Sequence, residues 1–182
     1  MDSSKFNRRI FLKNTVVGIG GASLLISCKG AISPWRFFSK TEAKLVIAIC
    51  EQIIPADDDP GATDANVINF IDKQLVGPYM RFQKMYRNGL ESTQQTCVQL
   101  YQSMFQDLSW QRQTEVLQGM ESGEVPADLW PDPTSPSFFN MIRQHTMQGF
   151  YGSPRHGGNP NYMSYRMLKL DYPQIIGQNR YK

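Results

Sequence analysis

One stretch, residues 135–159, constrains the fold of this chain more than any other, because it joins an amphipathic helix to a polar loop that contains glycine. Residues of one helical face recur in it at i, i+4, i+7 and i+11, namely Phe138, Ile142, His145 and Gly149. Ser135 or Ser137 can cap the helix, and Ser153-Pro154 ends it. The pattern predicts a helix that buries one face, with His145 as a hydrogen-bonded core residue rather than a catalytic one.

The loop after this helix contains the densest polar cluster of the sequence, which consists of Arg155, His156, Gly157, Gly158 and Asn159. The arginine can bind an anionic or planar group through its forked guanidinium, and the histidine can donate or accept a hydrogen bond. Adjacent glycines allow backbone N–H groups to face outward. The cluster predicts a binding surface, and a tight surface turn is the alternative interpretation.

Helical spacing of apolar residues recurs along the chain from residue 41 onward, and no alternating strand pattern appears. Thr41, Asp64 and Ser109 are the expected N-caps, and Gly123 is expected to end a helix. Besides the helix near residue 135, the expected helices cover residues 41–54, 65–76, 79–101 and 110–122. The sequence therefore predicts an all-α fold, an irregular bundle of about five or six helices with long ordered loops.

The charged and metal-binding residue types exclude several functions. Lysine and arginine are spread along the chain and the net charge is only +3, so nucleic-acid binding has no support. The two histidines and three scattered cysteines show no ligand spacing, so no metal site is predicted. Three consecutive aspartates, residues 57–59, precede Pro60-Gly61 without the pattern of a calcium loop, which favours an acidic turn.

The cysteines fall into two groups. Cys50 and Cys97 lie within apolar helical patterns, so we expect buried thiols, and a disulfide formed in an oxidising compartment is the alternative. Cys28 ends the sequence Leu-Ile-Ser-Cys, which resembles a bacterial lipobox. This resemblance predicts that Cys28 carries a lipid and holds the protein at a membrane surface. The alternative is an ordinary signal-peptide end with a chance cysteine.

The first 30 residues have the features of a targeting segment. Residues 7–13 closely resemble the twin-arginine export signal, and the matching positions are Arg8, Arg9, Phe11, Leu12 and Lys13. The weakly apolar run that follows is too short to span a bilayer as a mature helix. We therefore expect a signal segment over residues 1–30, a tether over 31–40, and a helical domain over 41–182. The aromatic residues of the tether could dock on the domain or on lipid.

Two blocks of the sequence resemble the signature of the gluconate 2-dehydrogenase subunit 3 family. The first, residues 53–72, contains Ile-Ile-Pro-Ala-Asp, Pro-Gly-Ala and Phe-Ile-Asp in that order. The second, residues 145–159, reads HTMQGFYGSPRHGGN and contains the family's His-Thr, Gly-Phe and Pro-Arg-x-Gly-Gly-Asn in the same order. Together the blocks bracket most of the chain, and their combination and order make the resemblance specific.

The resemblance implies a small accessory subunit that carries no redox cofactor of its own. Its partner would be the large subunit, a flavin-dependent sugar or sugar-acid dehydrogenase of the glucose–methanol–choline type that binds FAD, and a cytochrome c could receive the electrons. Such large subunits commonly leave the cytoplasm bound to the small one, which implies a periplasmic, membrane-attached complex. The sequence agrees, because it contains no dinucleotide fingerprint, haem-attachment motif or iron–sulfur cysteine cluster.

Within this reading, the residues expected to face the partner are Phe150, Tyr151, Arg155, His156, Gly157, Gly158 and Asn159. Two rival hypotheses remain. One is an enzyme that uses His145 with Asp72 or His156 as acid and base, although no nucleophile or oxyanion motif accompanies them. The other is a membrane-anchored scaffold or binding lipoprotein without a redox partner.

Overall fold

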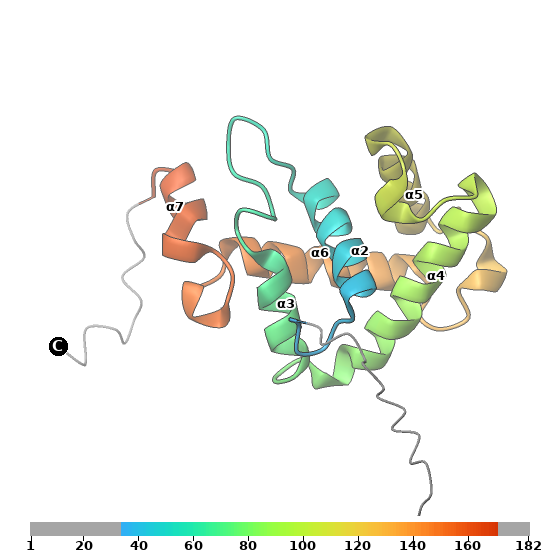
Figure 1. Ribbon diagram of the computed structural model, residues 1–182, viewed down its shortest axis with the longest axis horizontal. Coiled ribbons are helices and arrows are strands. Elements are labelled where there is room, and N and C mark those ends of the chain that lie inside the picture. The colour runs from blue at the N-terminus through green and yellow to red at the C-terminus, as the bar shows by residue number, and fades with distance from the viewer. Residues whose placement is uncertain (1–33, 171–182) are drawn as a thin grey trace, which may run out of the picture. The chain divides into compact units, whose positions relative to one another are not determined.

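The computed structural model describes residues 34–170, and all of its regular structure there is helical (Figure 1). The α-helices are Lys40–Ile53 (α2), Val67–Leu75 (α3), Gln83–Tyr101 (α4), Trp110–Ser122 (α5), Ser135–Tyr151 (α6) and Met163–Met167 (α7). The predicted all-α bundle is thereby confirmed. None of these helices is long and apolar enough to cross a membrane. The predictions for the export signal and for Cys28 lie outside the described residues.

Two of the predicted helix caps are confirmed and three are wrong. Ser109 caps α5, and Gly123 ends it with φ 81°. Helix α2 begins at Lys40, one residue earlier than expected, because Ser39 and Glu42 form a reciprocal capping box in place of a cap at Thr41. Helix α3 begins without a side-chain cap, since the Asp64 carboxylate accepts a hydrogen bond from the backbone N–H of Gly61. Helix α6 has Thr134 as its N-cap residue in place of Ser135 or Ser137, and no side-chain cap hydrogen bond forms there.

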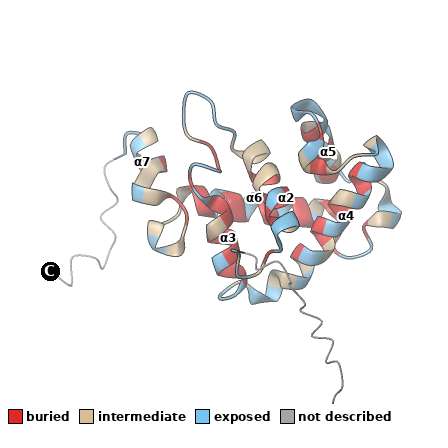
Figure 2. Ribbon diagram, viewed as in Figure 1, coloured by how far each residue is buried: buried red, intermediate tan, exposed pale blue. Residues whose placement is uncertain are grey.

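Helix α6 lies at the centre of the domain and contacts α2, α3, α4, α5 and α7. Its predicted apolar face is confirmed, because the four residues that define it are all buried: Phe138, Ile142, His145 and Gly149. Figure 2 shows the buried residues along α6 and on the neighbouring helices α2 and α3. The 3.6-residue period of the sequence thus corresponds to a helix that other helices cover.

Close helix packing at two glycines makes this arrangement possible. A Cβ atom on Gly89 of α4 would overlap the Phe138 ring, and one on Gly149 would lie 3.1 Å from Phe70 and Val67. Gly89 does not interrupt α4, which runs through it unbroken. The aromatic ring of one helix therefore rests directly on the backbone of the next.

The buried histidine of α6 is surrounded by aromatic side chains. The Nδ1 atom of His145 lies 3.0 Å from the hydroxyl of Tyr86, and its ring stacks on Tyr79 at 4.5 Å between centroids. Burial, with a smaller contribution from the charge of Arg81, lowers the pKa of His145 to about 4. Burial also raises the pKa of Tyr86, so the phenol keeps its proton and can donate it to the neutral imidazole. The predicted core histidine is confirmed.

The two cysteines of the domain are free and buried, as predicted. Burial raises the pKa of Cys50 to about 12 and does the same for Cys97. The Cys50 sulfur lies 3.2 Å from the hydroxyl of Thr146 on α6. At neutral pH both groups are therefore protonated thiols that act as core residues.

The last residues of the expected tether belong to the folded domain. Asp72 of α3 is completely buried, and its carboxylate accepts hydrogen bonds from the backbone N–H groups of Arg36 (2.8 Å), Phe37 (2.9 Å) and Phe38 (3.2 Å). Phe38 is buried in the core, and Arg87 of α4 donates to the Phe37 carbonyl at 2.7 Å. The boundary expected at residue 40 is therefore several residues too late, because Asp72 fixes the chain from Arg36 onward.

Removing the Asp72 carboxylate should destabilise the domain strongly. In Asp72→Ala, three backbone N–H groups lose their acceptor in a buried setting, and we expect a loss of about 2–4 kcal/mol in the free energy of unfolding. Chemical denaturation measures the change. Asp58→Ala, in the exposed acidic turn, is the matched control and should change the same free energy by less than about 0.5 kcal/mol. Equal effects of the two variants would contradict the role given to Asp72.

Acid should destabilise the domain through His145. Its pKa is about 4 in the folded chain and ordinarily near 6.5, so between these values the unfolded chain binds more protons. The stabilisation is complete above about pH 6.5 and is lost as the pH falls toward 4, with a maximum loss of about 3 kcal/mol. Denaturation of the native chain and of His145→Gln across this range measures the effect. The variant should show the shallower pH dependence, and parallel curves would contradict the assignment.

Candidate functional site

The polar cluster predicted from the sequence lies where the C-terminal end of α6 meets α3. After Tyr151 the chain forms a short 3-10 helix, Pro154–His156, which a second one follows at Pro160–Tyr162. Helix α3 contacts both α6 and the first of these 3-10 helices. The loop is therefore packed between two helices and is not a free surface turn.

Polar side chains of α3 hold the loop by its backbone carbonyl groups. Asn69 donates to the carbonyl of Gly157 at 2.7 Å, and Lys73 donates to that of Arg155 at 3.0 Å. Gln74 reaches the carbonyl of His156 at 3.5 Å. Three consecutive carbonyls are thus bound by one face of one helix, which fixes the direction of the loop.

Three of the loop's backbone N–H groups are used inside the chain. Those of His156 and Gly157 donate to the carbonyls of Ser153 and Pro154, and that of Asn159 donates to Ala65 at 2.7 Å. These three groups are not available to a ligand. The expectation that the glycines turn N–H groups outward does not hold for Gly157, because the tight turn pairs its N–H with the carbonyl of Pro154.

The two glycines of the loop serve close packing. A Cβ atom on Gly158 would overlap the carbonyl oxygen of Gly149 in α6, a backbone atom that cannot move aside. Gly157 has φ 107°, a conformation that favours glycine, and its Cβ would lie 2.8 Å from the Asn69 amide. The Gly-Gly pair therefore lets the loop lie directly on α6 and α3.

Three residues expected at the partner interface lie inside the domain instead, and one of them is the buried Gly158. Asn159 is completely buried, and its side chain donates to the carbonyl of Gly152 (2.8 Å) and accepts from the N–H of Ser164 (2.9 Å). Phe150 is also completely buried, because it faces the core from the inner side of α6. None of the three can contact a partner on the surface of this fold, so all three leave the predicted interface.

Four of the expected residues do reach the surface, and one of them is the partly exposed Gly157. Arg155 is exposed, and Tyr151 and His156 are partly exposed. The Arg155 Nε group donates to Nε2 of His156 at 3.0 Å, so the guanidinium and the imidazole are held side by side. The hydroxyl of Tyr165 in α7 donates to the Tyr151 carbonyl at 2.7 Å and fixes the end of α6. These side chains form one polar and aromatic edge.

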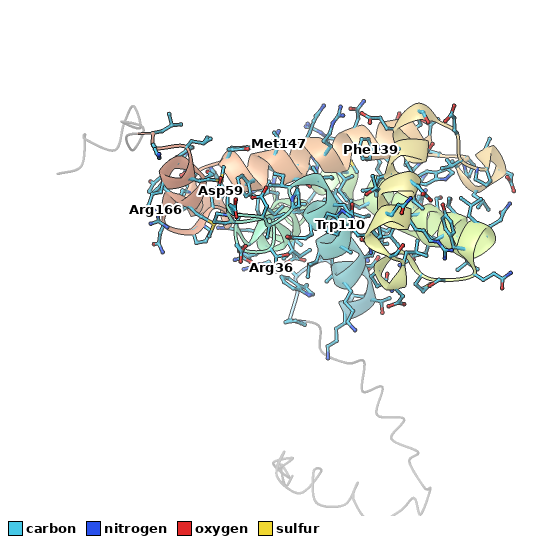
Figure 3. All side chains as sticks on the ribbon, turned by 90° about the horizontal axis from the view of Figure 1, so that it is seen from above. Arg36, Asp59, Trp110, Phe139, Met147 and Arg166 are labelled. Atoms are coloured by element: carbon cyan, nitrogen blue, oxygen red, sulfur yellow. The ribbon has the colours of Figure 1, made fainter. Side chains whose placement is uncertain are left out.

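An open groove of about 500 Å³ lies along this edge. The residues that line it come from α3, α6 and the turns beside them: Phe70, Gln74, Tyr79, Met147, Gln148, Tyr151, Gly152 and His156. The Tyr79 hydroxyl donates to Gln148 at 2.5 Å and closes one wall. Met147 is 42% exposed, and Figure 3 shows it on the outer side of α6.

Sequence reasoning missed Met147, Gln148 and Tyr79. One signal was present, because Met147 is an apolar residue on the face of α6 opposite the buried one, and Tyr151 follows it at i+4. Tyr79 could not be found in this way, since it reaches the groove only through the packing of α3 and α4 on α6.

The arrangement offers a binding surface along the groove. His145 has Tyr86 and Tyr79 as its neighbours, whereas the Asp72 carboxylate binds residues 36–38, so these contacts do not assemble the His145–Asp72 pair of the enzyme hypothesis. Within residues 34–170, no group of three or more histidine, cysteine or acidic side chains could hold a metal ion. The groove's apolar and aromatic walls suit a protruding side chain or segment of another molecule.

Truncation of Asn159 should destabilise the domain, whereas truncation of Arg155 should leave its stability almost unchanged. Asn159→Ala removes two buried hydrogen bonds and places alanine at φ 50°, so we expect a loss of about 3 kcal/mol in unfolding free energy before any partner is added. Arg155→Ala removes an exposed side chain and should change that free energy by less than about 0.5 kcal/mol. Denaturation of both purified variants tests this, and a stable Asn159→Ala chain would show that the residue is not structural.

Comparisons with curated proteins and with solved structures found no match to the sequence. The family model described as gluconate 2-dehydrogenase subunit 3 matches residues 40–171, which include every α-helix of the domain and both blocks of sequence that resemble the family. The chain therefore belongs to the gluconate 2-dehydrogenase subunit 3 family.

Proposed function

We propose that this chain is the non-catalytic small subunit of a flavin-dependent sugar or sugar-acid dehydrogenase. Membership of the family is consistent with an accessory subunit of a dehydrogenase complex. The observation that carries the proposal is the groove beside the family motif, where Tyr151, His156 and Met147 meet at the surface. The buried residues of the motif, Gly158 and Asn159, hold the loop beneath that surface in place.

The composition of the groove suits the recognition of a protein. Aromatic residues, methionine and arginine are enriched in protein–protein interfaces and supply much of their binding energy. Tyr79, Tyr151 and Met147 line the groove, and the exposed Arg155 precedes His156 at its edge. A protruding apolar side chain of the catalytic subunit would fill the groove, and a carboxylate beside it would pair with Arg155.

The charge around the groove predicts what the partner presents. Between Asp132 and Asp171 the sequence contains no acidic residue, and the cations there are Arg143, Arg155, Arg166 and Lys169. Arg143 is paired with Glu121 of α5, whereas Arg155 and Arg166 are exposed. A complementary partner surface would carry carboxylates, which would steer the two subunits together and fix their orientation.

The catalytic subunit would carry out the redox chemistry of the proposed complex. FAD would be bound by the large subunit, which would be of the glucose–methanol–choline type, and a cytochrome c would accept the electrons. The sequence of this chain supports the division, because it holds no dinucleotide or haem-attachment motif. The reaction of the complex would be the oxidation of a CH–OH group of a sugar or sugar acid.

The proposal further assigns export and anchoring to the N-terminal segment. Its Arg8-Arg9 signal would direct the folded subunit, with the catalytic subunit bound to it, through the twin-arginine route to the periplasm. A lipid on Cys28 would then hold the complex at the membrane. Assembly before export requires that the groove bind its partner in the cytoplasm.

Recovery of the catalytic subunit tests the groove. The chain is expressed in its native organism with a C-terminal tag, purified from membranes, and scanned for flavin absorbance. Met147→Glu places a carboxylate in the groove against a partner surface expected to be acidic, and should lower recovery of the flavoprotein at least tenfold, which corresponds to about 1.4 kcal/mol. The substitution lies on an exposed position and should leave the fold intact.

Leu100→Glu is the matched control, because Leu100 is 50% exposed at the C-terminal end of α4 and lies outside the groove. Its recovery of flavoprotein should equal that of the native chain. Full recovery by Met147→Glu would remove the groove from the interface. A native chain that brings down no flavoprotein would contradict the accessory-subunit proposal itself and favour a scaffold or binding lipoprotein.

A further inference from the structure

The chain enters the domain beside the turn that joins α3 to α4. Asp72, just before this turn, binds the backbone of residues 36–38, and Arg87, just after it, donates to the Phe37 carbonyl and lies over the Phe37 ring at 4.0 Å. The two residues that hold the incoming segment therefore bracket the turn. Figure 1 shows this segment running along the α3–α4 end of the domain.

The turn itself, residues 76–84, combines exposed apolar side chains with cations, and we refer to it as the basic turn. Met80 is 59% exposed and Val76 is 41% exposed, and Gly77-Pro78 forms the tip between them. Arg81 and Lys84 are exposed as well. Exposed apolar residues next to cations are the pattern of surfaces that lie in the interface of a bilayer.

Few carboxylates oppose these cations. From residue 73 to residue 90 the sequence holds Lys73, Arg81, Lys84 and Arg87 and no acidic residue. Nearby carboxylates are already engaged: Asp72 is buried against residues 36–38, and Glu42 is paired with Arg87. Asp132 lies 3.7 Å from Lys84, and both side chains are nearly four-fifths exposed, so water screens this pair.

We propose that the basic turn lies against an anionic membrane surface and orients the domain on it. This inference rests on the proposed anchoring at Cys28. Six residue steps separate Cys28 from Pro34, the first described residue, and they span at most about 22 Å at 3.3–3.6 Å per residue. Because Asp72 fixes the chain from Arg36 onward, a lipid on Cys28 keeps this end of the domain within reach of the bilayer.

The basic turn borders the groove through Tyr79, whereas Met147 lies in the groove on the outer side of α6. Figure 3 shows Met147 and Arg36 on opposite sides of the domain. The side on which the chain enters can therefore face lipid while the outer side of α6 faces a protein partner. The basic turn has the chemistry of lipid contact, with Met80 to enter the interface and Arg81 and Lys84 to bind phosphate headgroups.

A fluorophore on the basic turn tests this contact directly. The full chain carries Cys28→Ser, which removes the lipid site, and Met80→Cys, which supplies one reactive thiol. Cys50 and Cys97 remain unlabelled because they are buried and protonated. An environment-sensitive dye at position 80 should shift its emission to the blue on vesicles made of equal parts phosphatidylglycerol and phosphatidylcholine. The same dye at Leu100→Cys should show no shift.

The charges of the turn are tested separately. Each cation near an anionic surface contributes about fivefold to binding, so Arg81→Gln with Lys84→Gln should weaken the vesicle affinity reported by the dye about 25-fold. Arg112→Gln with Arg166→Gln, which removes two exposed cations from α5 and α7, should change it less than about twofold. The effect of the first pair should diminish at high salt.

Three results would overturn the inference. The first is a dye at position 80 that stays in water while the N-terminal segment holds the chain on the vesicle. The second is equal binding by both charge variants. The third is loss of flavoprotein recovery from Arg81→Gln with Lys84→Gln at unchanged vesicle binding, which would make the turn a protein interface. The vesicle assay contains neither lipid anchor nor partner, so its failure would leave the accessory-subunit proposal unaffected.

Discussion

The contact between side chain and backbone at Gly89 and Gly149 is the constraint on which the rest of the domain depends. Any side chain at Gly89 would collide with the Phe138 ring, and one at Gly149 would press on Phe70 and Val67. Because neither position carries a side chain, α6 can contact all five other described α-helices and bury the face that carries His145. Interiors are packed too densely to absorb an added methyl group at such points, so these glycines determine how close the helices come.

The same close packing explains why so short a motif forms the edge of the groove. Gly158 lies on the carbonyl of Gly149, and α3 binds the three carbonyls that precede it in the loop. Asn159 then closes the turn from inside through Gly152 and Ser164. With its backbone fixed on three sides, the loop has only one direction left for the side chains of Arg155 and His156, which is toward the solvent.

The residues that the sequence placed correctly are those whose environment is set by local spacing. The face of α6, the buried cysteines, the core histidine and the cap at Ser109 all follow from a 3.6-residue period or a single helix end. Phe150 and Asn159 were placed at the surface because a motif does not show which of its members point inward. The role of Asp72 was missed for a different reason: its partners lie about 35 residues away, where no local pattern connects them. Tyr79 of the groove was missed for the same reason, since it faces Gln148 across 69 residues.

The buried polar groups bear on how the chain would bind the proposed partner. Among the buried side-chain nitrogen and oxygen atoms of residues 34–170, Ser164 Oγ alone lacks a hydrogen-bond partner within the chain. His145, Asp72, Asn159 and Thr146 all have hydrogen-bond partners within the chain. The partner would then bind a domain that is already folded, so binding would cost little conformational entropy in the small subunit. A domain of this kind can fold first, carry its groove already formed, and select a partner that fits it.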